Sequence, residues 1–171
     1  MWREIPSMAA KEKTLEDLFL NGLKDVYYTE KQILRALPKM AKAAESDELR
    51  QAFETHRGET EGQVQRLEQV FEIMGKKASG KTCPAIQGII EEGREVMETF
   101  AESEALDAGL LAAAQSVEHY EISRYGTLRS WAQELGMKNA VKLLEETLAE
   151  EKKTDQLLTE LAEARMNQKA A

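Results

Sequence analysis

The stretch VEHYEISRYGTL (Val117–Leu128) places two glutamates where the seam of a packed helix normally carries leucine. Apolar side chains recur at steps of three and four residues from Leu111 to Leu128, which is the spacing of a helix in a bundle. Glu118 and Glu121 take two successive positions of this seam. An isolated buried carboxylate is destabilising, so such groups are normally paired, protonated or bound to metal. The stretch therefore predicts a buried helix with a polar site at its middle.

Three further segments show the same interrupted seam. The four long helices are expected at about Thr14–Ala44, Ser46–Gly75, Leu106–Leu135 and Asn139–Ala164. The interruption is Glu30 in the first helix, and it extends over several residues in the second and fourth helices. These are His56, Glu59, Thr60 and Gln63 in the second, and Thr147, Glu150, Glu151 and Asp155 in the fourth. One polar residue in a seam is common, whereas four coincident interruptions indicate one shared site.

The order of the segments predicts the topology. The first two helices and the last two form antiparallel hairpins with tight turns, and a stretch of some 30 residues joins the hairpins. That stretch carries an extra short helix, Pro84–Ser103, and is long enough to cross the bundle. The expected fold is all-α, a ferritin-like four-helix bundle with one long crossover. We place the bundle at residues 14–165, a flexible extension at 1–13 and a frayed tail at 166–171, with Met1 and Met8 as alternative starts.

The composition limits the partners and the compartment. The chain has 171 residues, 42% hydrophobic and 32% charged, which suits one globular domain. A net charge of −8 disfavours nucleic acid and anionic membranes as partners. No stretch approaches the length of a membrane span. The single cysteine, Cys83, forms no internal disulfide, so we expect a reducing, cytoplasmic location.

The hairpin geometry predicts that the polar residues meet. Two residues equally far from an antiparallel turn lie at the same height, which holds for Glu30 with Glu59 and for Glu121 with Glu150. A shift of 91 positions maps the first pair onto the second. If the two hairpins pack about a twofold axis, the four carboxylates converge.

The residue types at this level predict a metal site. His56 and Glu59 are three apart and share one helix face, as do Glu118 and Glu121. Carboxylates with an imidazole suit iron, manganese or zinc, and two such ions would offset the buried charge. The predicted ligands are Glu30, His56, Glu59, Glu118, Glu121 and Glu150. Three alternatives stay open. Glu151 and Asp155 could be the ligands of the fourth helix instead of Glu150, and Glu118 could hydrogen-bond to a ligand rather than bind the ion. The carboxylates could also be paired with Lys or Arg instead of metal.

Four stretches carry a family resemblance, namely Tyr28–Leu34, His56–Gln63, Val117–Leu128 and Glu150–Asp155. Together they resemble the ferritin-like bacterial stress-protein family typified by YciF. The resemblance covers about residues 14–164 and implies a cytoplasmic homodimer with a di-metal centre, most simply di-iron. Ferritins and rubrerythrins carry Glu-x-x-His on two helices. Here the second helix instead has His56-x-x-Glu59, and the fourth has Glu150-x-x-Lys153.

Two functional hypotheses follow. In the first, the chain is a stress-response protein whose di-iron or di-manganese centre reacts with oxygen or peroxide, as an oxidoreductase would. In the second, it is a non-enzymatic structural or stress protein whose metals only stabilise the bundle. Iron storage is a third possibility, but it requires a cage of many subunits, whereas the resemblance and the apolar side of the crossover helix favour a homodimer.

Overall fold

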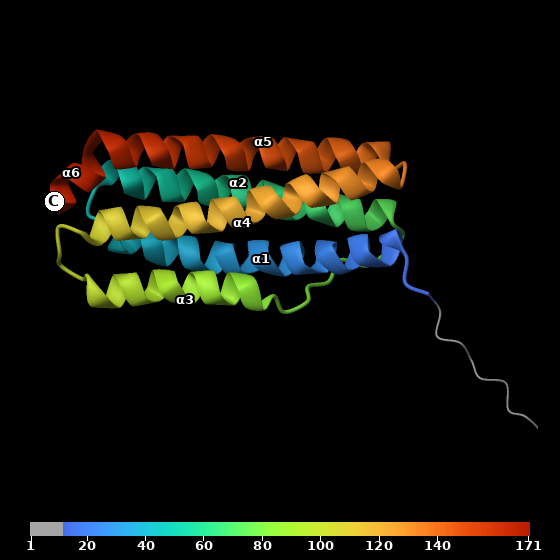
Figure 1. The fold of residues 1–171 in the computed structure, drawn as a ribbon, viewed down its shortest axis with the longest axis horizontal. Helices are drawn as coiled ribbons and strands as arrows, with labels where there is room; N and C mark the ends of the chain where they lie inside the picture. Colours follow the sequence, from blue (N-terminus) through green and yellow to red (C-terminus); the bar gives the residue numbers. More distant parts are fainter. Residues whose placement is uncertain (1–11) are drawn as a thin grey trace, which may run out of the picture.

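The computed structural model describes residues 12–171, and this part of the chain is helical, with no strand. Five helices form the body of the molecule (Figure 1), and a π-helical segment and a short final helix follow the last of them. Their bounds are α1 Leu15–Ala43, α2 Asp47–Ile73, α3 Pro84–Thr99, α4 Leu106–Glu134, α5 Lys138–Leu161, η1 Ala162–Met166 and α6 Asn167–Ala170.

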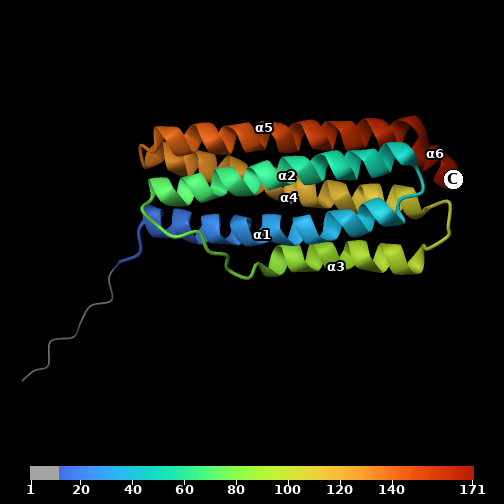
Figure 2. The same cartoon turned by 180° about the vertical axis from the view of Figure 1, so that it is seen from behind.

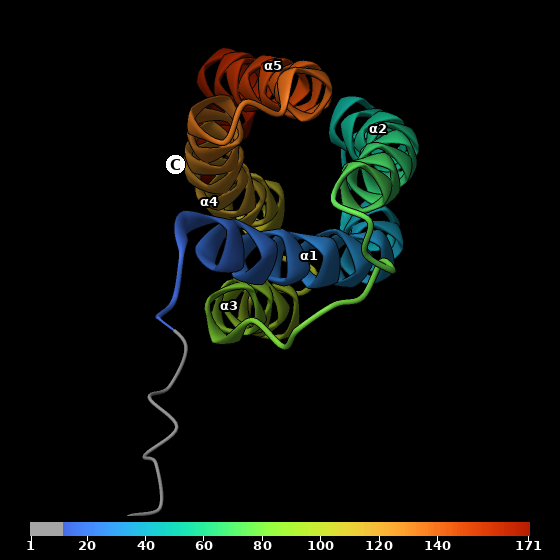
Figure 3. The ribbon, with the colours of Figure 1, turned by 90° about the vertical axis from the view of Figure 1, so that its right-hand side faces the viewer.

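Four helices form a closed ring, and the fifth lies outside it. Seen end-on in Figure 3, α1, α4, α5 and α2 follow one another around the bundle, and each packs on its two neighbours. Helix α3 packs on α1 and α4 from outside. The link from α2 to α3 starts at one end of the bundle, and α3 ends at the other, as Figures 1 and 2 show. The predicted ferritin-like bundle with one crossover and an extra short helix is confirmed.

Local sequence signals set the helix ends. The Thr14 hydroxyl accepts a hydrogen bond from the Asp17 amide, and the Asp17 carboxylate accepts one from the Thr14 amide, which together cap α1. Gly75 and Gly136 follow α2 and α4 with φ values of 65° and 71°. Glycine adopts this left-handed conformation without steric penalty, so both helices end where the sequence predicts.

A buried carboxylate from α4 stabilises the turn between α1 and α2. Asp107 is 2% exposed, and its two oxygens accept hydrogen bonds from the Glu45 and Ser46 amides, each at 2.8 Å. Ser46 in turn caps α2 by accepting from the Leu49 amide. Amides at a helix start have no intrahelical acceptor, so a carboxylate there satisfies them and complements the helix dipole. Asp107 thereby ties the second hairpin to the turn of the first.

The core is divided into two apolar clusters by a layer of buried polar residues. One cluster lies toward the α1–α2 turn and includes Leu37, Phe53, Leu111 and Leu158. The other lies toward the α4–α5 turn and includes Leu23, Leu67, Leu128 and Leu144. Each of the four ring helices contributes to both. The residues between, here called the polar layer, are Glu30, His56, Thr60, Gln63, Glu118, Glu121, Thr147, Glu151 and Thr154.

The ends of the chain differ from expectation in one respect. The tail 166–171, expected to fray, is helical up to Ala170, and Met166 is buried in the core cluster at that end. Lys169 forms an ion pair with Glu45 at 3.0 Å. Of the predicted flexible extension, residues 1–13, only residues 12 and 13 are among the described residues. The choice between Met1 and Met8 lies outside them. None of the described helices is long and apolar enough to span a membrane.

Replacing Asp107 tests the turn. In Asp107→Ala the Glu45 and Ser46 amides lose their acceptors, so the free energy of unfolding should fall by about 1–3 kcal/mol. Asp107→Asn keeps one acceptor oxygen and should lose less. Urea unfolding followed by circular dichroism measures both, with the exposed Glu92→Ala on α3 as control. Equal unfolding midpoints for Asp107→Ala and Glu92→Ala would contradict this role.

Candidate metal centre

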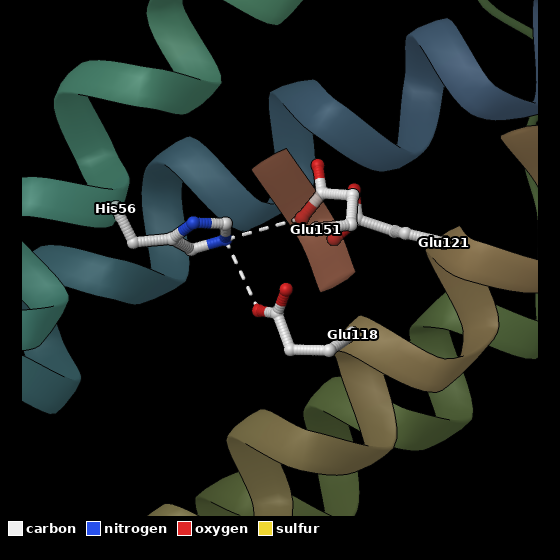
Figure 4. Close-up of side chains that lie close together, drawn as sticks. All are labelled: His56, Glu118, Glu121 and Glu151. Carbon is white, nitrogen blue, oxygen red and sulfur yellow. Dashed lines mark ion pairs between the residues drawn. The ribbon is translucent and has the colours of Figure 1, made fainter. Parts of the chain in front are cut away.

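Three helices bring one histidine and three glutamates together at the centre of the bundle. His56 comes from α2, Glu118 and Glu121 from α4, and Glu151 from α5, and Figure 4 shows their polar ends converging. One ligand atom of each lies within 4.8 Å of the others. His56 Nε2 is 3.1 Å from Glu118 Oε1 and 4.0 Å from Glu151 Oε2. All four residues are buried, so this group can hold a cation away from bulk water.

Glu30 from α1 lies beside this group. It is fully buried, and the Tyr125 hydroxyl donates a hydrogen bond to its Oε1. Its electrostatic neighbours include Glu121, His56 and Glu118, which ties α1 to the same site. Tyr125 is not among the predicted ligands. Its position at the i+4 spacing from Glu121 was the sequence signal that it reaches the site.

Two predicted ligands, Glu59 and Glu150, lie at the edge of the site instead. Their side chains are each 25% exposed. Glu59 Oε2 is 3.6 Å from His56 Nδ1 and accepts a hydrogen bond from Thr154, so it contacts the outer side of the imidazole. Glu150 binds Arg66 through both oxygens, at 2.8 and 2.5 Å. Glu151, the alternative that the sequence left open, lies in the buried group, whereas Glu150 and Asp155 do not.

Asp155 points elsewhere. Its Oδ1 is 3.0 Å from Nε2 of His119, whose side chain is 69% exposed, and it also accepts a hydrogen bond from Gln115. His119 and Asp155 thus form a pair at the surface of α4 and α5. The second histidine of the chain does not belong to the buried group.

The position of Glu150 at the rim has a simple geometric cause. With the observed helix ends, the turns centre on Glu45 and Gly136, half a residue from where the sequence analysis put them. The residue level with Glu121 is then Glu151, and the residue level with Glu30 is Thr60. Neighbouring residues on a helix differ by about 100° in direction, so one position separates an inward side chain from a rim side chain. Glu59 and Glu150 remain equivalent under the 91-residue shift, and both lie at the rim.

The two hairpins therefore contribute unequally to the centre. Glu30 and Glu121 are equivalent and both fully buried. The other residues of the buried group have equivalents of a different kind. His56 corresponds to Thr147, and Glu151 corresponds to Thr60. The site is consequently pseudo-symmetric in its frame, with a single imidazole, on the side of α2.

Many buried polar atoms of the centre have no hydrogen-bond partner within residues 12–171. They include Oε2 of Glu30 and Glu118, both carboxylate oxygens of Glu121 and Glu151, and both ring nitrogens of His56, which approach the Glu118 and Glu59 carboxylates as ion pairs only. Buried polar groups are nearly always satisfied, and unsatisfied ones are costly. Acceptor oxygens facing one another cannot satisfy each other unless protonated. A divalent cation bound by oxygen and nitrogen would satisfy them together, so the donor set fits a metal.

Without a cation, the protonation equilibria of these groups are strongly displaced. Burial raises the pKa of Glu30 to about 7, although the Tyr125 hydrogen bond lowers it. Burial and then the charge of Glu151 raise the pKa of Glu121 well above its usual range, and burial does the same for Glu151. Burial opposes a charged imidazole, but the nearby Glu118 and Glu59 carboxylates raise the pKa of His56 well above its usual value. Metal binding would have to displace these protons.

The displaced pKa values predict how stability depends on pH in chelator-treated protein. Glu30 titrates near pH 4.5 when unfolded and near pH 7 when folded, so the folded state holds the proton more tightly. Its contribution is present below pH 4.5 and is lost as pH rises to about 7, by about 3 kcal/mol. His56 acts with the same sign at higher pH. Urea unfolding at pH 5, 6, 7 and 8 should therefore show falling stability.

Glu30→Gln provides the control for this prediction. Glutamine is uncharged at every pH, so this variant should lose part of the slope, whereas Glu92→Gln at the surface should keep it. A metal-free protein that becomes more stable between pH 5 and 7 would contradict the displaced pKa values. The same titration with added metal should reverse the slope, since ligand deprotonation favours binding.

Comparison with known proteins places the chain in a family. Residues 14–171 match the family model described as Domain of unknown function (DUF892). Protein YciF of Escherichia coli (strain K12) is 50% identical over 159 residues, 92% of this chain and 96% of YciF. The crystal structure of that stress protein superposes with a TM-score of 0.87, covering 91% of this chain and 99% of the other. The structure of YcfI from Rhodopseudomonas palustris superposes with a TM-score of 0.85 at 47% sequence identity. The match covers 90% of this chain and 98% of YcfI. This chain therefore belongs to the DUF892 family and is a homologue of YciF.

Proposed function

We propose that this chain is a stress-response protein whose polar layer holds two divalent metal ions and reacts with a small oxidant, oxygen or peroxide. Iron is the favoured metal and manganese the redox-active alternative. The same ligands accommodate zinc, which is not redox-active and would only stabilise the bundle. The observation that supports this most strongly is the set of unsatisfied oxygens and nitrogens on His56, Glu118, Glu121 and Glu151. The relative YciF is a stress protein of Escherichia coli, which supports the cellular role.

The arrangement of the ligands supports two ions. His56, Glu118 and Glu151 would hold one ion on the α2 and α5 side. Glu30 on the α1 side and Glu121, which neighbours it, would hold the second ion. Redox-active metal ions there would supply the electrons that reduce the oxidant. The chain itself would orient the ligands, exclude water through the apolar clusters, and hold a proton on the Tyr125 hydroxyl.

Tyr125 suits the role of proton holder. Burial, and then the Glu30 and Glu121 charges, raise the pKa of Tyr125 well above its usual value, so its hydroxyl stays protonated and donates to Glu30. A fixed donor on Glu30 orients one oxygen of that carboxylate and leaves the other, Oε2, for an ion.

A second function, a metal centre that only stabilises the bundle, is favoured by the composition of the site. The centre has one nitrogen ligand, and its equivalent on the other hairpin is Thr147. Arg66 also holds Glu150 away from the ions. In this case the ions would hold α1, α2, α4 and α5 together by neutralising their carboxylates, and no oxidant would be consumed.

We also propose a homodimer in the cytoplasm. In the sequence, the apolar side of the crossover helix is one reason to expect a dimer. In the structure that side faces the bundle: Ile86 is fully buried, and Ile89, Ile90 and Met97 pack against the core. Support for a dimer therefore comes from the family resemblance. Native mass spectrometry should give twice the mass of the chain, and a 12-mer or 24-mer would instead support iron storage.

Metal content per chain tests the centre. Protein purified without a metal-affinity tag and reloaded with Fe(II) in the absence of oxygen should contain about two ions per chain by elemental mass spectrometry. Glu121→Ala and Glu151→Ala should each lose most of this metal, because they remove buried ligands. Glu150→Ala is the matched control, since its carboxylate binds Arg66, and it should retain the metal.

The outcomes separate the proposals. No retained metal in a folded wild-type protein would refute the metal centre, and retention of one ion would refute the second site. Loss in Glu150→Ala with retention in Glu151→Ala would contradict the ligand assignment.

Peroxide consumption distinguishes the two functions once metal is present. If the centre reacts with oxidants, the Fe(II)-loaded protein should reduce one hydrogen peroxide to water for every two Fe(II) oxidised to Fe(III), and it should do so repeatedly when added ascorbate returns the iron to Fe(II). The rate in Glu151→Ala should be at least about tenfold lower. If the metal is structural, the loaded protein should show no turnover, yet chelation should still lower its free energy of unfolding by several kcal/mol.

A further inference from the structure

An apolar cavity of about 210 Å³ opens between α1 and α3 and reaches the centre of the bundle. Its walls come from α1, α2, α3, α4 and α5 and are mostly aliphatic, with Ile33, Ile90, Met97 and Leu158 among them. Its inner end is formed by the buried residues His56 and Glu118, and its outer end by the half-buried Gln32 and the exposed Arg35, Lys39 and Arg94. Walls that are mostly aliphatic favour an apolar group in such a cavity.

The charges along the cavity are ordered by sign. Arg35 and Lys39 on α1 and Arg94 on α3 lie at the opening. Arg94 is engaged by Glu91, whereas Arg35 and Lys39 form no ion pair with any residue in 12–171. At the inner end Glu118 is the acid that lines the cavity, with Glu121 and Glu151 close behind it. A cationic opening in a chain of net charge −8 is a local feature that favours an anionic group.

Size and charge together define a ligand class. An apolar cavity of about 150 Å³ accommodates benzene, so about 210 Å³ accommodates roughly eight to ten non-hydrogen atoms. We propose that this cavity binds a medium-chain aliphatic carboxylate, with the hydrocarbon tail between α1, α3 and α4 and the carboxylate at Arg35 and Lys39. The reverse orientation would place a carboxylate against the acidic centre, which the charges disfavour.

The binding does not depend on the proposed metal chemistry. The tail is held by the aliphatic wall and the head by cations of α1, and none of these groups is a ligand of the metal centre. The bound tail would nevertheless end beside His56 and Glu118, so the cavity would deliver an apolar group to the edge of the centre. The crossover helix α3 thereby gains a role, because it closes one side of the cavity with Ile89, Ile90 and Met97.

Isothermal titration calorimetry of chelator-treated, full-length protein with octanoate tests the proposal. One saturable site is expected, and butanoate, which has too short a tail, should bind at least tenfold more weakly. Octan-1-ol, which keeps the tail but has no charge, should also bind about tenfold more weakly. Absence of saturable octanoate binding would overturn the proposal, and equal affinity for octan-1-ol would overturn the assignment of the head group.

Two variants with matched controls locate the ligand. Arg35→Gln/Lys39→Gln should weaken octanoate binding about tenfold, whereas Lys142→Gln/Lys152→Gln on α5, with the same loss of charge, should leave it unchanged. Ala36→Leu adds carbons to the cavity wall and should weaken binding at least about fivefold, with the exposed Ala149→Leu as control. Octanoate binding that both test variants leave intact would place the ligand elsewhere and overturn the proposal.

A second copy of the chain is the alternative occupant of this face. If the protein is a dimer that binds no octanoate, and Ala36→Leu converts it to a monomer, then α1 and α3 form a subunit interface and the proposal is wrong. Because all these titrations use metal-free protein, their failure would leave the metal measurements of the proposed function unaffected.

Discussion

The burial of mutually repelling carboxylates at mid-height is the constraint on which the rest of this structure depends. Glu30, Glu118, Glu121 and Glu151 come from three helices and have one imidazole between them. In isolation each would oppose folding, because a buried charge without a counter-charge is unfavourable. Three features offset this cost. Tyr125 donates a hydrogen bond to Glu30, and Arg66 neutralises the further carboxylate of Glu150 at the rim. The apolar clusters on either side supply favourable burial.

The residues that stabilise the fold and the residues of the candidate site lie in different parts of the bundle. The two apolar clusters supply the hydrophobic driving force, and each combines side chains from both hairpins. The Asp107 carboxylate ties the hairpins together at one end. Because the clusters stabilise the fold, the buried polar layer can contribute unfavourably to the free energy of folding. This is usual for a site that becomes stable only when its ligand binds. The cavity beside α3 passes through the adjacent apolar cluster and ends at this level.

Sequence alone predicts most of the fold because the helix signals are strong. Seam spacing, the Thr14 cap and the glycines at 75 and 136 place every long helix within a few residues. The polar layer is predictable too, since four interruptions coincide in height. The choice between Glu150 and Glu151 is not, because it depends on half a residue in the centre of a turn. Arg66 is also missed, since nothing in its spacing indicates that it turns toward α5. The tail illustrates a tertiary effect, because Met166 is ordered by the core it enters rather than by its own propensity.

The alternation of apolar, polar and apolar levels also determines how the helices align lengthwise. In a seam made only of leucine, one helix can slide past another by a turn, about 5.4 Å, and still find apolar neighbours. Here the same slip would carry Glu121 toward the cluster around Leu128 and bring leucines against the remaining acids. The slipped arrangement loses both hydrophobic contact and charge neutralisation at once. The polar layer therefore specifies a single lengthwise register for all four helices, whatever ion it binds.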